Sequence, residues 1–239
     1  MSLLSRYHHQ TAKALFLLLI VFQIGYSSEF YLTAGTGFFL QNYFKGSGPH
    51  EPDNINLRTD KVWADNRFSG FGLKGSLLNL KGSNFGAEFG VQYNHSKFPE
   101  QDVELSYFFY SGSLFQPSFE VKSYSLQLTA LFSTLPDKGL MSNSLIPYAG
   151  VGLSYSIASI SDVNLEPEYG VGGESDGKGF GYLFKAGAKY LMHENYIIDA
   201  EIFYHAASIH VEKFRSYNID GIDGTFSSLA IMMLFGYSF

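Results

Sequence analysis

The chain ends in LAIMMLFGYSF (residues 229–239), where large apolar residues alternate with mostly smaller ones. A period of two places the two sets on opposite faces of a β-strand. The large set is Leu229, Ile231, Met233, Phe235, Tyr237 and Phe239. A soluble sandwich has little reason to end in such a face, whereas membrane lipid would cover it. The stretch therefore predicts a closing strand that faces lipid, with Met232 and Leu234 on its inner side.

The composition agrees with a membrane β-structure. Only 16% of the 239 residues are charged, below the usual quarter, while 17% are aromatic. The mean hydropathy is near zero, as expected where apolar lipid-facing residues and polar interior residues average out. The absence of cysteine excludes disulfides, thiol catalysis and cysteine-ligated metals. The net charge of -6 argues against nucleic acid as a partner.

Residues 1–28 have the features of a secretory signal peptide. Arg6 and Lys13 precede the apolar run ALFLLLIVFQI (14–24), and small residues follow it up to Ser28. This run is too short to cross about 30 Å of hydrocarbon as a helix. We therefore predict a cleaved signal at 1–28 and one mature barrel domain at 29–239. Loss of two cations would take the formal charge from -6 to -8.

Seven further stretches alternate like the terminal one. The predicted strands are 30–44, 71–77, 85–94, 124–132, 145–157, 180–190, 196–205 and 225–239. Long loops are predicted at 45–66, 95–118, 159–178 and 207–224, with short turns between them. Outer-membrane barrels have long extracellular loops and short periplasmic turns. The sequence thus predicts an all-β, eight-stranded antiparallel up-and-down transmembrane β-barrel. The apolar run at 103–110 leaves open a β-extension above the membrane or an additional strand.

The same alternation assigns a polar interior. Its predicted members are Lys74, Glu88, Gln92, Gln127, Lys185, Lys189, Asp199 and Glu201. Eight-stranded barrels are wide enough only for side chains to fill them, and buried charges must pair. Three cations facing three anions predict a neutral polar plug. A gated ion or proton path along the same groups is the alternative.

Three motifs resemble the small bacterial outer-membrane β-barrel family that includes the OmpA membrane domain, opacity-type proteins and OmpX/Ail. They are the run IPYAGVGLSY (146–155), the pair of runs GYLFKAGAKY (181–190) and DAEIFY (199–204), and the aromatic C-terminus. The resemblance implies an integral protein of the outer membrane of a Gram-negative bacterium. It also implies that Phe235, Tyr237 and Phe239 form the signal for the barrel-assembly machinery, and that outer-membrane lipid and lipopolysaccharide are partners.

Catalytic and metal-binding patterns are weak. His205 and Ser208 lie three apart, and His95 precedes Ser96, but neither pair has the His-x-Ser-Asn pattern of lipid A deacylases. Apart from His8 and His9 in the predicted signal peptide, the histidines are scattered singly at 50, 95, 193, 205 and 210, which argues against a transition-metal site. Acidic residues at 166–176 resemble a solvated loop more than a calcium site. We expect no enzyme activity and no cofactor.

The expected function is that of a cell-surface barrel whose four loops serve adhesion or binding, or which supports envelope integrity. A small OmpW-like, porin-like channel for small or hydrophobic solutes, with a lateral exit, is the alternative. A lipid A-modifying hydrolase is a third.

Overall fold

The computed structural model describes residues 29–50, 55–59, 61–65, 68–78, 80, 83–99, 101–107, 110–116, 119–134, 143–162, 174–192, 195–214 and 219–239. Over these residues the chain is almost entirely β-structure. None of them belongs to a helix of membrane-spanning length and apolarity. The predicted signal peptide lies outside them.

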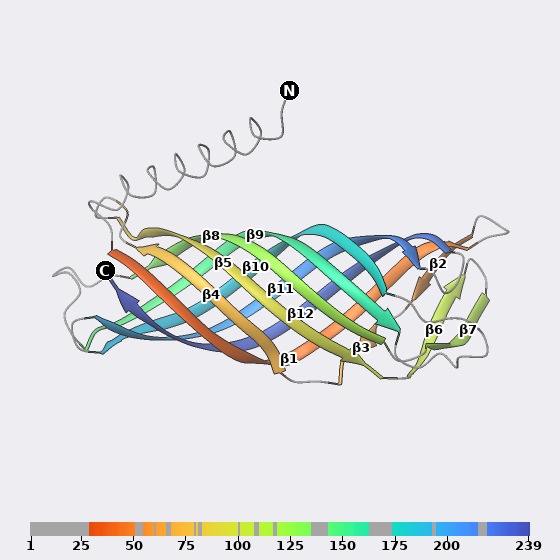
Figure 1. Cartoon of the computed structure of the whole chain (residues 1–239), viewed down its shortest axis with the longest axis horizontal. Helices are drawn as coiled ribbons and strands as arrows, with labels where there is room; N and C mark the ends of the chain where they lie inside the picture. The colour runs from red at the N-terminus through yellow and green to blue at the C-terminus, as the bar shows by residue number, and fades with distance from the viewer. Residues whose placement is uncertain are drawn as a thin grey trace, which may run out of the picture.

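Eight long strands form a closed antiparallel barrel (Figure 1). They are β1 (Glu29–His50), β4 (Phe68–Leu78), β5 (Phe85–Phe98), β8 (Phe119–Ser133), β9 (Leu145–Asp162), β10 (Glu174–Met192), β11 (Tyr196–Phe214) and β12 (Ile219–Ser238). Each pairs with its neighbour in this order, and β12 pairs with β1 to close the ring. The predicted fold class and all eight predicted strands are confirmed.

The closing seam joins β1 to β12 over residues 223–238. Its register extends from Tyr31 opposite Ser238 to Ser47 opposite Asp223, with a bulge between Phe39 and Gln41. The Phe239 amide donates to the Phe30 carbonyl at 3.0 Å. The first and last described residues therefore lie at one end of the barrel, called the terminal end below, and the opposite end is called the distal end.

The strands continue into stretches that the sequence predicts as loops. β1 reaches His50, β9 reaches Asp162 and β11 reaches Phe214, while β10 begins at Glu174 and β12 at Ile219. The predicted boundaries at 45–66, 159–178 and 207–224 are therefore too wide, and so is that at 95–118, because β5 continues to Phe98. Backbone pairing continues beyond the apolar belt, where water on the outer side no longer requires an apolar face, so the alternation is lost. The alternation of long and short connections stays a prediction.

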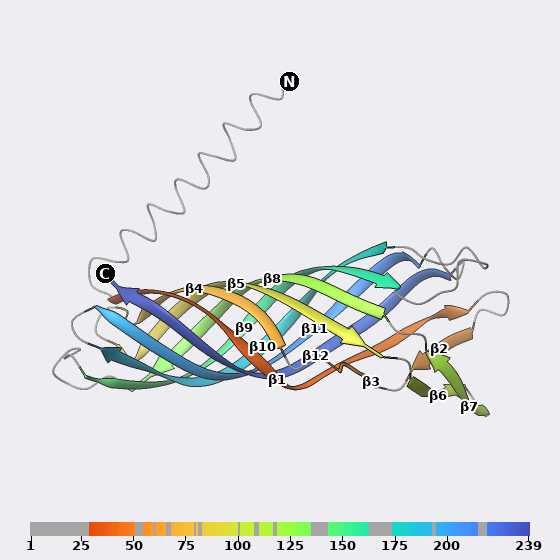
Figure 2. The same ribbon diagram turned by 60° about the horizontal axis from the view of Figure 1, so that its bottom comes forward.

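Four short strands lie at the distal end: β2 (Ile55–Thr59), β3 (Val62–Trp63), β6 (Gln101–Tyr107) and β7 (Tyr110–Gln116). β2 pairs with β1, β6 pairs with β2, and β7 pairs with β6. Figures 1 and 2 show β2, β6 and β7 beyond the barrel wall, opposite the C-terminus. The apolar run at 103–110 is therefore a β-extension and not a ninth wall strand, and the loop predicted at 95–118 contains this hairpin.

The outer wall carries an apolar belt between two rows of aromatic rings. At the terminal end the ring pairs are Phe30–Phe239, Phe85–Phe132 and Tyr196–Tyr237; towards the distal end they are Tyr43–Trp63, Tyr93–Tyr124, Tyr155–Phe180 and Tyr182–Tyr204. On β8 the rows are separated by the eight steps from Tyr124 to Phe132. At about 3.4 Å per residue and a tilt of about 40°, this spans roughly 21 Å, close to the ~25 Å band of membrane barrels.

The wall is interrupted towards the distal end between β1 and β5. β4 begins at Phe68, well short of the distal ends of β1 and β5. It pairs with β5 only from Phe71 onward. Gly70 has a φ of 87° at this break, a conformation that favours glycine. Two backbone bonds span the gap: Ala64 donates to the Asn42 carbonyl at 2.9 Å, and Asp65 to the Lys97 carbonyl at 2.8 Å. The segment 61–65 thus forms a strap across a gap in the wall.

Candidate functional site

A layer of charged side chains crosses the barrel interior. Its members are Lys74, Glu88, Lys185, Lys189, Asp199 and Glu201, all buried. Alternation along β4, β5, β10 and β11 turns them inward. Because three ammonium groups face three carboxylates, the layer is formally neutral. The predicted charged residues are thus brought together in one place.

Each cation in this layer has a carboxylate partner. Lys185 donates to Glu88 and lies 3.4 Å from Glu201 Oε2, and Lys74 donates to Glu201 Oε1. Lys189 donates to Asp199 Oδ2 at 2.5 Å. The layer therefore links the wall strands β4, β5, β10 and β11 across the lumen.

Tyr148 on β9 joins the two carboxylates of β11. Its hydroxyl lies 2.8 Å from Asp199 Oδ1 and 2.9 Å from Glu201 Oε2, and its ring lies beneath Lys189, 4.9 Å from the ammonium. Alternation along β9 places Tyr148 on the inner face, and this is the sequence feature from which an interior role could have been predicted. The sequence did not show that it would meet these carboxylates, because that depends on barrel stagger.

Glycines on the inner face make room for the charged layer. A Cβ at Gly187 would lie 2.8 Å from the Tyr148 hydroxyl and 2.9 Å from the Glu201 Cβ. A Cβ at Gly90 would lie 3.3 Å from Lys74 Cγ. Alternation of glycine with polar residues on these strands thus fits long interior side chains into a narrow barrel.

The two predicted glutamines extend the polar interior beside the charges. Gln127 donates to Gln92 Oε1 at 2.8 Å, and Gln92 donates to Asn94 Oδ1 at 2.9 Å. Ser76 donates to Glu88 Oε2 at 2.7 Å, which gives that carboxylate a further partner. All eight predicted interior residues are buried.

Apolar clusters fill the interior on the terminal side of the charged layer, beside it, and on its distal side. The cluster at the terminal end contains Tyr31, Leu78, Leu131, Ile146, Tyr148, Leu191 and Ile197. The middle one contains Phe39, Phe203, Ala230, Met232 and Leu234. The cluster towards the distal end contains Phe98, Phe119, Val121, Ala158, Ile160, Ala207 and Ile209. Met232 and Leu234 thus pack in the middle cluster with the rings of Phe39 and Phe203.

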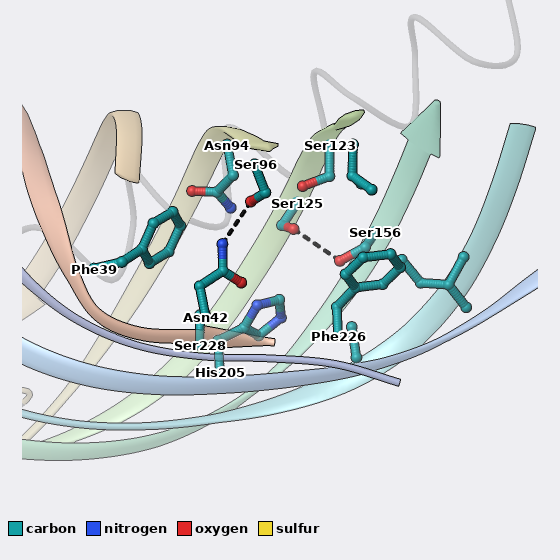
Figure 3. Close-up of a pocket in the computed structure, with 13 residues that line it drawn as sticks. Phe39, Asn42, Asn94, Ser96, Ser123, Ser125, Ser156, His205, Phe226 and Ser228 are labelled. Carbon is teal, nitrogen blue, oxygen red and sulfur yellow. Dashed lines mark hydrogen bonds between the residues drawn. The ribbon is translucent and has the colours of Figure 1, made fainter. Parts of the chain in front are cut away.

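A small polar cavity lies between the middle and distal clusters (Figure 3). Its volume is about 30 Å³, room for one or two waters. Asn42 donates to Ser96 Oγ at 2.6 Å, and Ser125 and Ser156 are 2.7 Å apart. His205 also lines the cavity, and its Nε2 is 2.7 Å from Ser154 Oγ. Because Asn42 and Ser96 lie on β1 and β5, the cavity adjoins the gap in the wall.

Neither histidine–serine pair seen in the sequence forms a site. His205 is buried in the lumen, whereas Ser208 is exposed on the other face of β11. His95 faces outward and meets Glu120, while Ser96 faces inward and meets Asn42. The close pair is instead His205 with Ser154, from another strand. Within the described residues the cavity lining contains no carboxylate, and no group of three or more His, Cys, Asp or Glu is placed to hold a metal.

The predicted assembly residues Phe235, Tyr237 and Phe239 lie on the outer face of β12 at the terminal end, where all three are exposed. Tyr237 contacts the rings of both Tyr196 and Phe239. They form part of the aromatic row around that end. The acidic residues 166–173 lie outside the described part of the chain.

Together, the closed wall, the apolar belt and the filled interior define an eight-stranded barrel of the transmembrane type. Side chains fill the interior over the part of the barrel that the structure describes.

Comparison with solved structures agrees with this class. The chain is similar to the outer membrane protein OprG from Pseudomonas aeruginosa, with a TM-score of 0.50, 14% identity, and coverage of 90% of this chain and 98% of that one. It also matches Ail of Yersinia pestis (TM-score 0.44, 15% identity, 89% and 99% coverage). For the E. coli outer membrane protein W the values are 0.40, 15%, 89% and 98%. No protein-family model and no curated protein sequence matches the chain. The chain has the fold of small bacterial outer-membrane β-barrel proteins, as the resemblance in its sequence predicted.

Proposed function

We propose that the chain is an integral outer-membrane protein whose plugged barrel carries a binding surface at its distal, extracellular end. One observation carries this proposal: charged and apolar layers fill the lumen over its length. Binding of a partner is therefore expected at the distal surface rather than inside the barrel. Lipopolysaccharide and the barrel-assembly machinery are its expected partners during and after insertion.

The extension of β2, β6 and β7 is the part of this surface best suited to binding. Within the described residues, β7 pairs with β6 alone and forms the last strand of the sheet. An unpaired strand edge can accept an extended segment of another protein. The sequence of β7, YSGSLFQ, has no charge and no proline to oppose such pairing.

Replacing residues 101–116 with a short Gly-Ser linker tests the surface role. We expect at least a ten-fold loss of bacterial adhesion to immobilised matrix proteins and glycans, because the edge strand is removed while the eight wall strands remain. The measurement is adhesion of cells that produce each variant, with the outer-membrane amount determined in parallel. The same replacement at 163–173 serves as the control and should adhere normally. Unchanged adhesion after removal of 101–116 would reject this surface.

The gap in the wall favours a second candidate function, a channel with a lateral exit. The strap 61–65 fills the gap through backbone hydrogen bonds to β1 and β5, and Asn42 and Ser96 of the polar cavity lie on these two strands. If the strap moved, a solute could leave sideways into lipid rather than through the plugged end.

Planar-bilayer conductance and uptake of an apolar dye separate the plugged barrel from the lateral channel. We expect no steady open channels from the refolded protein, since the lumen is filled at three levels. Tyr43 and Trp63 are paired across β1 and β3, so Tyr43→Cys/Trp63→Cys would lock the strap in a chain that otherwise has no cysteine. Under the plugged-barrel proposal, oxidation of this variant should leave apolar-dye uptake unchanged. Uptake that stops on oxidation and returns on reduction would establish the lateral channel instead.

We also propose that Phe235, Tyr237 and Phe239 direct assembly and that the chain is not a lipid hydrolase. Removal of Phe239 should take the protein out of the outer-membrane fraction, whereas Ser238→Ala should not. The separation of His205 from Ser208 supports the second statement. A changed lipid A mass on expression of the chain, restored by His205→Ala, would overturn it.

A further inference from the structure

We propose that a polar patch on the outer face of β5 and β8 binds the phosphate of a lipid headgroup in the outer leaflet. The patch, called the rim patch below, consists of His95, Lys97, Glu120 and Lys122. The proposal rests on the proposed insertion in the outer membrane and adds a defined lipid site to it.

The rim patch lies at the height where headgroup phosphates begin. Tyr93 and Tyr124 face each other across β5 and β8, with ring centroids 5.0 Å apart, and belong to the distal aromatic row. Towards the distal end, the next pair on this outer face is His95 with Lys122, and the one after it is Lys97 with Glu120. Two residues advance a strand by about 7 Å. The patch is therefore one step above the rings that mark the edge of the hydrocarbon.

Contacts within the patch hold its cations in place. Glu120 Oε2 is 2.9 Å from His95 Nε2, and Glu120 Oε1 is 3.1 Å from Lys97 Nζ. The hydrogen bond from His95 lowers the pKa of Glu120, so this carboxyl remains ionised at neutral pH. The Lys97 side chain is still 60% exposed, and Lys122 is exposed beside it. The Lys97 ammonium can therefore contact a ligand while it remains close to Glu120.

The charge of the patch favours an anion with several oxygens. Two lysines against one carboxylate leave a net charge of +1 before any contribution from His95. The strap adjoins the patch through the bond from the Asp65 amide to the Lys97 carbonyl. It brings Asp65 and also Lys61, whose ammonium lies 4.7 Å from the centre of the Tyr43 ring. A phosphate oxygen can accept from Lys97 and another from Lys122, while the acyl chains lie along the apolar wall below.

Binding of lipid A to the purified full-length protein in detergent micelles tests the proposal. Native mass spectrometry would compare diphosphorylated lipid A with the same lipid after dephosphorylation. We expect wild-type protein to retain only the phosphorylated form. Lys97→Gln/Lys122→Gln should lose about five-fold in affinity for each lysine removed. Glu120→Gln should bind at least as well as wild type, because it removes a repulsive charge. Lys178→Gln, an exposed lysine on β10, is the matched control and should bind normally.

Several outcomes would overturn the lipid site. Equal retention of dephosphorylated lipid, wild-type binding by the double variant, or the same loss in Lys178→Gln would each reject it. Displacement of the lipid by millimolar inorganic phosphate would show a site for free phosphate instead. Failure of the proposed insertion is distinguishable, since the protein would then lack the heat-dependent gel shift of a folded barrel in micelles without lipid A.

Discussion

Lys185→Met should destabilise the folded barrel by about 3–5 kcal/mol, because it leaves buried carboxylates without their shared cation. Lys185 is the one lysine of the charged layer that contacts both Glu88 and Glu201, and these groups lie away from solvent. Methionine has a length similar to that of lysine and keeps the packing. The loss of unfolding free energy therefore reports the missing charge rather than a change in side-chain volume. The measurement is urea unfolding in micelles, followed by the gel shift of the folded barrel.

The control for this change is Lys97→Met, which removes an exposed lysine and should change the free energy of unfolding by less than about 1 kcal/mol. Lys185→Met/Glu88→Gln restores neutrality within the layer and should recover most of the loss. If the single variant were as stable as wild type, the layer would be open to water and the plugged lumen would be wrong.

Gly35→Ala should disrupt the seam between β1 and β12 and cost about 3 kcal/mol or more. A Cβ at Gly35 would meet the Met233 carbonyl oxygen and lie 2.6 Å from the Leu234 Cα. Both are backbone atoms, so no side-chain rotation can relieve the contact. The expected result is a barrel that fails to close, measured as loss of the folded band after refolding and loss of outer-membrane protein in cells.

Gly75→Ala is the matched control for the seam. Its Cβ would lie 3.4 Å from the nearest atom of the Phe30 ring, an ordinary contact on the lipid-facing side. This variant should fold with wild-type yield. Equal yields for both variants would show that the seam tolerates movement, and that its register is less restrictive than the strand pairing indicates.

The alternation of side chains predicted the wall because the two faces of each strand meet different surroundings. In β12, Met233 meets the apolar belt while Met232 is enclosed by Phe39 and Phe203, and a period of two separates them. The same rule turned Lys74 and Glu201 inward. It could not pair them, because they are 127 residues apart and meet only through the stagger of the closed barrel.

Features at the distal end were less predictable. Beyond the belt, water lies outside the wall, so strands such as β6 need no apolar face and their ends cannot be read from alternation. The gap beside β4 depends on where pairing stops near Gly70. Alternation along β11 turns His205 inward, but its partner Ser154 lies 51 residues away in the chain. Only strand register places them together.

The charged layer also has a consequence for how the chain finds its register. A shift of β10 against β11 by one residue would expose the wrong face, but a shift by two would keep every apolar residue outward and retain the backbone ladder. In either direction that shift moves Lys189 by about 7 Å along the strand from Asp199, which faces it in the native register. Lipid cannot distinguish the two arrangements, whereas the buried ion pairs can. The interior charges therefore select the native alignment among those that the membrane would accept.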